Sequence, residues 1–101
     1  MKNFRTYDLA VTFYHRIQEL RLPSHVKSQL QRAALSVPLN LAEGRGKRTT
    51  ADQTRFFQIA LGSVREMEAI FDVVHIDSNQ PLRKHLDHLA ASTYLLIQRA
   101  R

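Results

Sequence analysis

The sequence predicts an all-α protein with the architecture of an up-down-up-down antiparallel four-helix bundle. Apolar residues recur at the helical period in four segments, and breakers containing proline or glycine separate them. No stretch alternates apolar and polar residues as a half-buried strand does. The links are short, and short links make consecutive helices antiparallel neighbours. A chain of 101 residues has room for one domain, predicted to span residues 1–101.

The first two helices are bounded by proline and glycine. The first is expected over about residues 7–20, where one apolar stripe follows the helical period, and Pro23 ends it. The second is expected over about residues 24–43. Ser24 is its predicted N-terminal cap, because a serine hydroxyl accepts from the free backbone N–H groups of a first turn. Gly44 is the predicted C-terminal stop.

The last two helices have recognisable start signals. The third is expected over about residues 50–76, with Thr50 and Gln53 forming a capping box at its start and Phe56 among its core-facing residues. The fourth is expected to begin at Pro81, because proline is tolerated in the first turn of a helix. It continues nearly to Arg101.

Two of these helices carry more apolar surface than a single bundle buries. On the third, the apolar arc is about twice the width that a bundle helix needs, and Phe57 and Leu61 fall in its outward part. On the second, Leu35 and Leu39 lie one turn apart, opposite the core stripe. Scattered exposed apolar residues are common on monomers, but clustered ones mark interfaces. These four residues are therefore the predicted contacts of a homo-oligomer.

The pattern holds no set of catalytic or metal-binding residues. His85 and His88 are three residues apart and could share a metal on a helix, but no further ligand completes a site. A solvated helix face is the expected environment of both. The segment from Gly44 to Lys47 resembles part of a phosphate-binding loop, but it lacks the full spacing and follows a helix. We expect a protein that is not an enzyme and has no cofactor or metal.

The composition predicts a soluble cytoplasmic protein. Cysteine is absent, which suits a reducing compartment and excludes disulfides and thiolate metal sites. The longest apolar runs, such as residues 59–61, are far too short to span a bilayer. The first residues lead straight into an amphipathic pattern, so we expect no secretory signal. We therefore expect no membrane association.

The basic charge points to a polyanionic partner. The net charge is +6, and the segment 44–50 contains Arg45, Lys47 and Arg48 with no acid among them. Arg55 follows about one turn into the next helix. Such clusters attract RNA or DNA through counterion release, so these four residues are the predicted nucleic-acid site. The alternative is a structural or protein-binding adaptor whose cations favour the carbonyl end of a helix and keep the chain soluble.

Several segments together resemble one known family. They are Ser28–Gly44, Arg45–Arg48, Phe56–Ser63 and Glu66–Glu68, and the opening Tyr7–Val11 is similar to the first helix of that family. The specific feature is the order arginine–alanine–alanine, proline–x–asparagine, alanine–glutamate–glycine. The family comprises four-helix-bundle proteins encoded by intervening sequences in bacterial 23S ribosomal RNA genes, together with stand-alone relatives. The resemblance covers about residues 4–74.

The resemblance implies an assembly and a set of partners. It implies a bundle that assembles into a ring-like homopentamer, and it brings no catalytic residues. It also implies similarity to the accessory proteins of diversity-generating retroelements, which are basic pentamers that bind nucleic acid and a reverse transcriptase. RNA or DNA, a second copy of the chain, and a reverse transcriptase or other protein are thus the implied partners. Leu39 departs from the family, which commonly has a small polar residue there.

Overall fold

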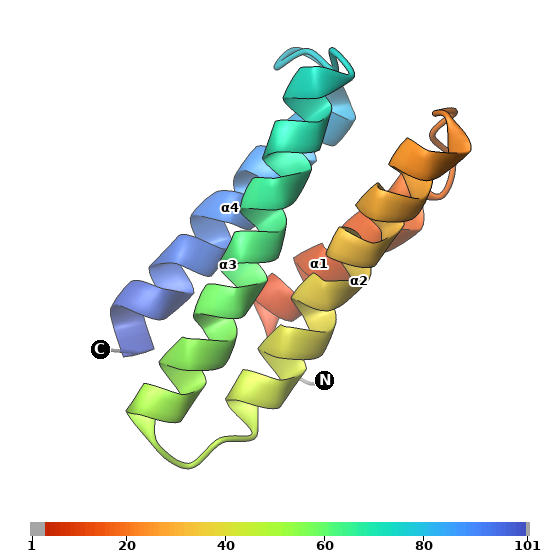
Figure 1. Ribbon diagram of the computed structural model, residues 1–101. Helices are drawn as coiled ribbons and strands as arrows, with labels where there is room; N and C mark the ends of the chain where they lie inside the picture. The colour runs from red at the N-terminus through yellow and green to blue at the C-terminus, as the bar shows by residue number, and fades with distance from the viewer. Residues whose placement is uncertain (1–3, 101) are drawn as a thin grey trace.

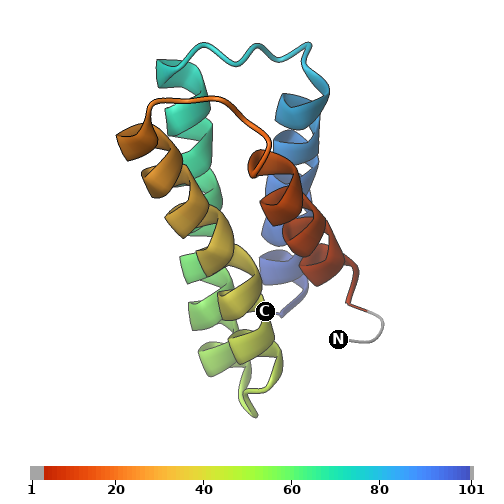
Figure 2. The ribbon, with the colours of Figure 1, turned by 90° about the vertical axis from the view of Figure 1, so that its right-hand side faces the viewer.

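The computed structural model describes residues 4–100, and this part of the chain contains four helices and no strand. They are α1 (Arg5–Ile17), α2 (Ser24–Arg45), α3 (Thr50–Val73) and α4 (Pro81–Ala100). The helices pack in a closed cycle, α1 on α2, α2 on α3, α3 on α4 and α4 on α1 (Figure 1). The side view shows consecutive helices running in opposite directions (Figure 2). The predicted antiparallel bundle is confirmed.

One apolar core runs through the bundle. Its largest fully buried side chains include Phe13, Ile17, Leu30, Leu41, Met67, Phe71, Leu86 and Leu89. Across the middle, the rings of Phe13 on α1 and Phe71 on α3 have centroids 6.1 Å apart. Every buried side-chain nitrogen or oxygen within the described range has a hydrogen-bond partner. The core is therefore largely apolar, and its few buried polar side-chain atoms are hydrogen-bonded. None of the described helices is long and apolar enough to cross a membrane.

The first turn of α2 is organised by the backbone, and the predicted Ser24 cap is wrong. The N-cap is Pro23, and no side chain accepts a capping hydrogen bond. The backbone N–H groups of Val26 and Lys27 both donate to the carbonyl of Pro23, at 3.0 and 2.9 Å. Because Ser24 already has helical geometry, its hydroxyl is not placed to cap. The preceding helix α1 also ends at Ile17, short of the predicted boundary.

The cap of α3 is one residue earlier than predicted. Thr49 Oγ1 accepts from the backbone N–H of Asp52 at 3.1 Å, so Thr49, not Thr50, caps the helix. The side chain of Gln53 does not complete a capping box. It donates to the carbonyl of Lys47 at 3.1 Å and ties the α2–α3 turn to α3.

A left-handed residue ends α3 before the predicted boundary at residue 76. His75 has a φ of 62°, and the N–H of Ile76 donates to the carbonyl of Phe71 at 2.9 Å. The N–H of His75 donates to the carbonyl of Asp72 at 3.3 Å. This pair of bonds is the Schellman motif, which closes a helix without a capping side chain. α3 therefore ends at Val73.

A glycine sets the spacing between α2 and α3. The predicted stop at Gly44 is wrong, because the helix continues to Arg45 and Gly44 is buried inside it. A Cβ added at Gly44 would lie 2.7 Å from Cε1 of Phe57. The ring of Phe57 therefore occupies the space that a side chain at position 44 would need. Phe57 is 4% exposed, so its predicted outward position is wrong: it precedes Ala60 and Val64 by three and seven residues and shares their stripe.

A polar contact joins α2 and α3 nearer their middle. The hydroxyl of Ser63 donates to that of Ser36 at 2.8 Å. Asn40 Nδ2 donates to the carbonyl of Ser36 at 2.9 Å. α2 continues through Pro38, whose side chain is buried.

His85 joins α1 to α4, and its predicted solvated environment is wrong. Its Nδ1 lies 2.8 Å from Nη1 of Arg16, and its Nε2 lies 3.1 Å from the carbonyl oxygen of Leu9. A guanidinium only donates, so Nδ1 accepts and Nε2–H donates to Leu9. The ring also meets Phe13 edge to face, with centroids 5.3 Å apart. Burial lowers the pKa of His85 below its usual value, and the charges of Arg16 and His88 act in the same direction.

Alanine at position 44 is expected to destabilise the fold by about 1–3 kcal/mol, because the new methyl group would overlap the Phe57 ring. Gly62 is the matched control, since an added Cβ there meets nothing within 4 Å. Gly62→Ala is expected to stabilise by about 0.5–1 kcal/mol through helix propensity. Urea unfolding measures both. A Gly44→Ala protein as stable as the wild type would show that the close approach imposes no constraint.

Stability is expected to fall as the pH drops below the ordinary histidine pKa. The folded pKa of His85 is lowered, so between the unfolded and folded pKa values the unfolded chain binds more protons. Protonation at Nδ1 also removes the acceptor for Arg16 and brings two cations together. Urea unfolding at pH 7.5 and at lower pH, compared with His85→Gln, tests this. The variant is expected to lose less stability on acidification, and an equal loss in both proteins would contradict the assignment.

Candidate nucleic-acid interface

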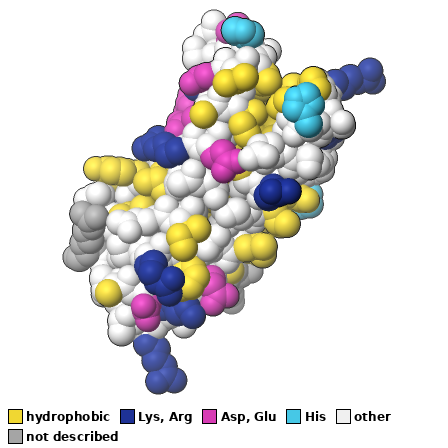
Figure 3. Space-filling model, in the orientation of Figure 1, with side chains coloured by type: hydrophobic (Ala, Val, Ile, Leu, Met, Phe, Trp, Pro, Cys, Tyr) yellow, Lys and Arg dark blue, Asp and Glu magenta, His cyan; other side chains and the backbone are white. Residues whose placement is uncertain are grey.

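The cations predicted to bind a polyanion lie at the end of the bundle where α2 turns into α3. Arg45 is the last residue of α2, Lys47 and Arg48 lie in the turn, and Arg55 lies in α3. The three arginines are exposed and Lys47 is half-buried. In the space-filling view, Lys and Arg side chains gather at the lower end, where this turn lies (Figure 3). The sequence cluster is thus also a cluster in space, at one pole of the molecule.

An aromatic ring holds two of these cations. Lys47 Nζ lies 5.1 Å from the centroid of the Phe56 ring, and Cζ of Arg55 lies 4.5 Å from it. Both distances allow cation–π attraction, worth about 0.5–1 kcal/mol at exposed sites. The predicted core-facing position of Phe56 is wrong, since its side chain is half-buried at this rim. The ring therefore fixes a lysine from the turn beside an arginine from α3.

The fold brings an acid against the cluster. Glu43 Oε2 lies 3.2 Å from Lys47 Nζ, one helical turn away along the chain. The pair is partly exposed, so its contribution to stability is at most about 1 kcal/mol. It nevertheless offsets part of the charge of Lys47. Arg45, Arg48 and Arg55 form no ion pair with any other described residue, so all three contribute exposed positive charge at this end.

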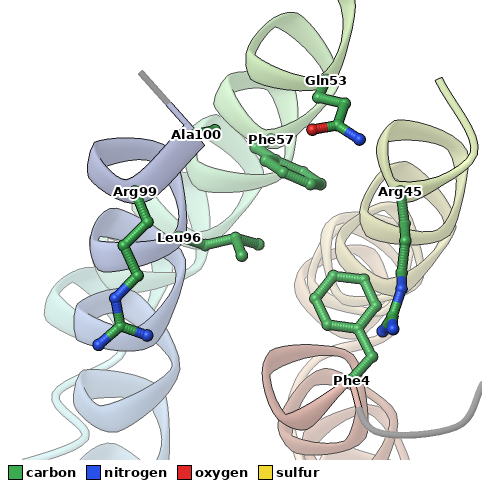
Figure 4. Close-up of a pocket in the computed structure, with 7 residues that line it drawn as sticks. All are labelled: Phe4, Arg45, Gln53, Phe57, Leu96, Arg99 and Ala100. Atoms are coloured by element: carbon green, nitrogen blue, oxygen red, sulfur yellow. The ribbon is translucent and has the colours of Figure 1, made fainter. Parts of the chain in front are cut away.

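Arg45 lies apart from Lys47 and Arg55. Its Cζ is 4.6 Å from the centroid of the Phe4 ring, next to the start of α1. There it lines a pocket of about 350 Å³ together with Arg99 near the end of α4 (Figure 4). Sequence reasoning missed Arg99, because no local pattern links it to residues near position 45. The four predicted cations therefore do not form a single cluster. Lys47 and Arg55 lie against the Phe56 ring, whereas Arg45 lies against the Phe4 ring.

Two acids in the second half of α3 form ion pairs. Asp72 Oδ1 lies 2.9 Å from Nη1 of Arg83, and Glu68 Oε1 lies 2.9 Å from Nη1 of Arg65. The hydrogen bond to Asp72 raises the pKa of Arg83 above its usual value.

Within residues 4–100, no group of three or more histidines and acids is placed to hold a metal ion.

The predicted oligomer contacts divide into exposed and buried residues. Leu35 and Leu39 on α2 are 43% and 59% exposed. Ile59 on α3 is also exposed, at 43%. Leu61 is only partly buried and packs against the core, whereas Phe57 belongs to the core itself. The exposed large apolar side chains on these two helices are therefore those of Leu35, Leu39, Ile59 and Val73, and Phe57 is not among them.

An apolar hollow lies between the first half of α2 and the last half of α3. Its volume is about 450 Å³. The apolar residues that line it are Val26, Ala69, Ile70, Val73 and Val74, with His25, Gln29 and Glu66 as polar neighbours. Val73 is 76% exposed, so this surface too leaves a large apolar side chain in water.

These features define the class: a small all-α bundle with a basic pole and exposed apolar positions on α2 and α3. The model of the 23S rRNA-intervening sequence protein family matches residues 2–94, which include α1 to α3 and most of α4. The chain therefore belongs to the 23S rRNA-intervening sequence protein family. A comparison with curated proteins finds no match. The resemblance carried by Ser28–Gly44 and its neighbouring segments is confirmed, and the family match extends past residue 74 into α4.

Proposed function

We propose that this protein is a non-catalytic, homo-oligomeric helical scaffold that binds RNA or DNA through its basic pole. The observation that carries the proposal is the placement of Lys47, Arg48 and Arg55 at one end of the bundle, with Arg45 on the adjoining side. Neutralising phosphates with such side chains releases condensed counterions, and this release drives sequence-independent binding.

Fixed and free cations play different parts in this contact. Arg55 is held on the Phe56 ring, so it has less side-chain freedom to lose on binding a phosphate. Arg48 is exposed in the turn and can follow the backbone of a nucleic acid. Lys47 exchanges its partner Glu43 for a phosphate. The pole therefore combines positioned charges with an adaptable one, and positive charge remains in excess.

Assembly strengthens a weak contact of this kind. The exposed leucines of α2 and Ile59 of α3 supply an apolar surface for a second copy of the chain. A ring-like pentamer, which the family resemblance implies, would repeat the basic pole five times. Contacts on one nucleic acid would then add as an effective concentration, without any single site binding tightly.

The second candidate is a structural or protein-binding adaptor. The observation that favours it is the apolar hollow beside Val73. The apolar face of a helix from a partner protein could pack into this hollow. In that case the positive charge serves solubility. A reverse transcriptase is a partner of this kind that the family resemblance suggests. The binding experiment below separates the two functions.

Removing Arg48 and Arg55, two cations without an ion-pair partner among the described residues, is expected to weaken polyanion binding. For Arg48→Gln/Arg55→Gln, the slope of log K against log salt for duplex DNA should fall by about 1.8, since each lost phosphate contact removes about 0.9. Anisotropy titrations of labelled random RNA and DNA at several salt concentrations measure it. Arg21→Gln/Lys84→Gln removes the same charge at the opposite end and is expected to keep the slope.

Two outcomes would contradict this prediction. A wild-type protein that binds neither RNA nor DNA at low salt excludes nucleic-acid binding and leaves the adaptor function. An equal loss of slope in the control variant shows that overall charge, and not the pole, is responsible.

Charging the exposed face of α2 is expected to dissociate the assembly. Leu35→Glu/Leu39→Glu would bury carboxylates without partners between subunits, which is costly. Tyr94→Glu/Leu95→Glu is the matched control, since these two residues on α4 are each 49% exposed. Light scattering after size exclusion should give several chain masses for the wild type and control, and one chain mass for the α2 variant. A monomeric wild type at tens of micromolar would refute the assembly.

A further inference from the structure

The Phe56 ring at the rim of the basic pole has two cations against it. Nζ of Lys47 lies 5.1 Å from the ring centroid, and Cζ of Arg55 lies 4.5 Å from the same centroid. The ring is itself held in place by the close packing of α2 and α3, since a Cβ added at Gly44 would lie 3.0 Å from Cβ of Phe56. One fixed ring thus brings a charge from the turn and a charge from α3 to the same place.

Charge alone gives this pole a limited attraction for nucleic acid. Glu43 Oε2 lies 3.2 Å from Lys47 Nζ. Asp52 adds a second carboxylate in the first turn of α3, one helical turn before Phe56. These two acids offset half of the four positive charges predicted to bind there. An attraction that does not depend on charge would therefore add substantially to binding at this end.

The contact between Arg55 and Phe56 supplies an attraction of that kind. Cζ of Arg55 lies over the ring, and the Arg55 side chain is exposed. Unpaired bases stack on aromatic rings and on the planes of arginine guanidinium groups. A base that stacks on Arg55 meets a guanidinium already held by the ring, so less side-chain freedom is lost than with an unsupported arginine.

A duplex does not offer this contact. Its bases are already paired and stacked, and moving one out of the helix costs free energy. The α2–α3 turn projects at one end of the bundle (Figure 1), so on a duplex it reaches phosphates. The combination of an aromatic ring with adjacent cations is instead typical of proteins that bind single strands.

We propose that the basic pole binds an unpaired nucleotide of single-stranded RNA or DNA. Its base stacks on the Arg55 guanidinium above Phe56, and the adjoining phosphates pair with Lys47 and Arg48. The proposal rests on the nucleic-acid binding proposed above and names the class of nucleic acid that this end prefers.

Anisotropy titrations of three labelled ligands of equal length test this on the full chain. They are oligo(dT), a strand with the same phosphates in which most nucleotides are abasic, and a random DNA duplex. Oligo(dT) is expected to bind at least about five-fold more tightly than the abasic strand, because base stacking adds to phosphate pairing. Equal affinity for the two strands would overturn the proposal and leave binding through phosphates in place. A protein that binds none of the three ligands at low salt would overturn the proposed nucleic-acid function as well.

Two variants locate the base contact. Phe56→Leu removes the ring and keeps every charge, whereas Arg55→Lys keeps the charge and removes the guanidinium plane. Each is expected to bring the affinities for oligo(dT) and the abasic strand within about two-fold of each other, with little change in duplex affinity. Because Arg55 is exposed, its substitution leaves the core intact and keeps the test valid should Phe56→Leu disturb folding.

Tyr14→Leu and Arg48→Lys are the matched controls. Tyr14 is a half-buried aromatic residue near the opposite end of the bundle. Arg48 lies in the basic turn, but no aromatic ring of the described residues lies beneath its guanidinium. Both controls are expected to keep the wild-type preference for oligo(dT). An unchanged preference in folded Phe56→Leu and Arg55→Lys, or an equal loss in the controls, would overturn the assignment of the site.

Discussion

The contact between Gly44 and Phe57 fixes the pair α2 and α3, and the arrangement of the basic pole depends on it. The ring of Phe57 takes the volume that any other residue at position 44 would fill. Successive residues on a helix differ by about 100°, so placing Phe57 in the core turns its neighbour Phe56 to the rim. There Phe56 meets Lys47. By the same rotation, Arg45 is directed from buried Gly44 toward the start of α1. One close contact thus determines where the cations of this end lie.

The short length of the chain limits the size of its core and leaves large apolar side chains on its surface. A chain this short buries a modest fraction of its apolar area, and the four helices nevertheless leave Leu39 and Val73 largely in water. The core itself is closed, and its buried polar side chains within residues 4–100 are hydrogen-bonded, so these exposed side chains are not a sign of poor packing. They lie on α2 and α3, the two helices that also carry the basic turn. Assembly through one surface and polyanion binding at the pole are therefore compatible, because they use different residues of the same helix pair.

The periodicity of the sequence was sufficient to predict four helices, their order and their antiparallel packing, because these follow from local apolar spacing and short links. It could not decide between Phe56 and Phe57. α3 is apolar over most of its circumference, so both residues fit an inward stripe, and the deciding feature is the missing side chain of Gly44 on another helix. His85 was misjudged for a similar reason: its partners Arg16 and Leu9 belong to α1, far away in the chain. Long-range contacts of this kind leave no trace in helical periodicity.

The cation site shows the same division between local and distant information. The cluster in the turn was visible in the sequence. The contacts of these cations with Glu43 and with the Phe56 ring, and the position of Arg99 near Arg45, arise only when the chain folds.

The central claim is that nucleic acid binds at the pole formed by residues 45–56. Ultraviolet cross-linking of single-stranded RNA to the intact protein, followed by peptide mass spectrometry, tests it most directly. The account predicts cross-links concentrated in residues 45–56, and cross-links at the opposite end, in residues 18–24 and 76–84, would contradict it.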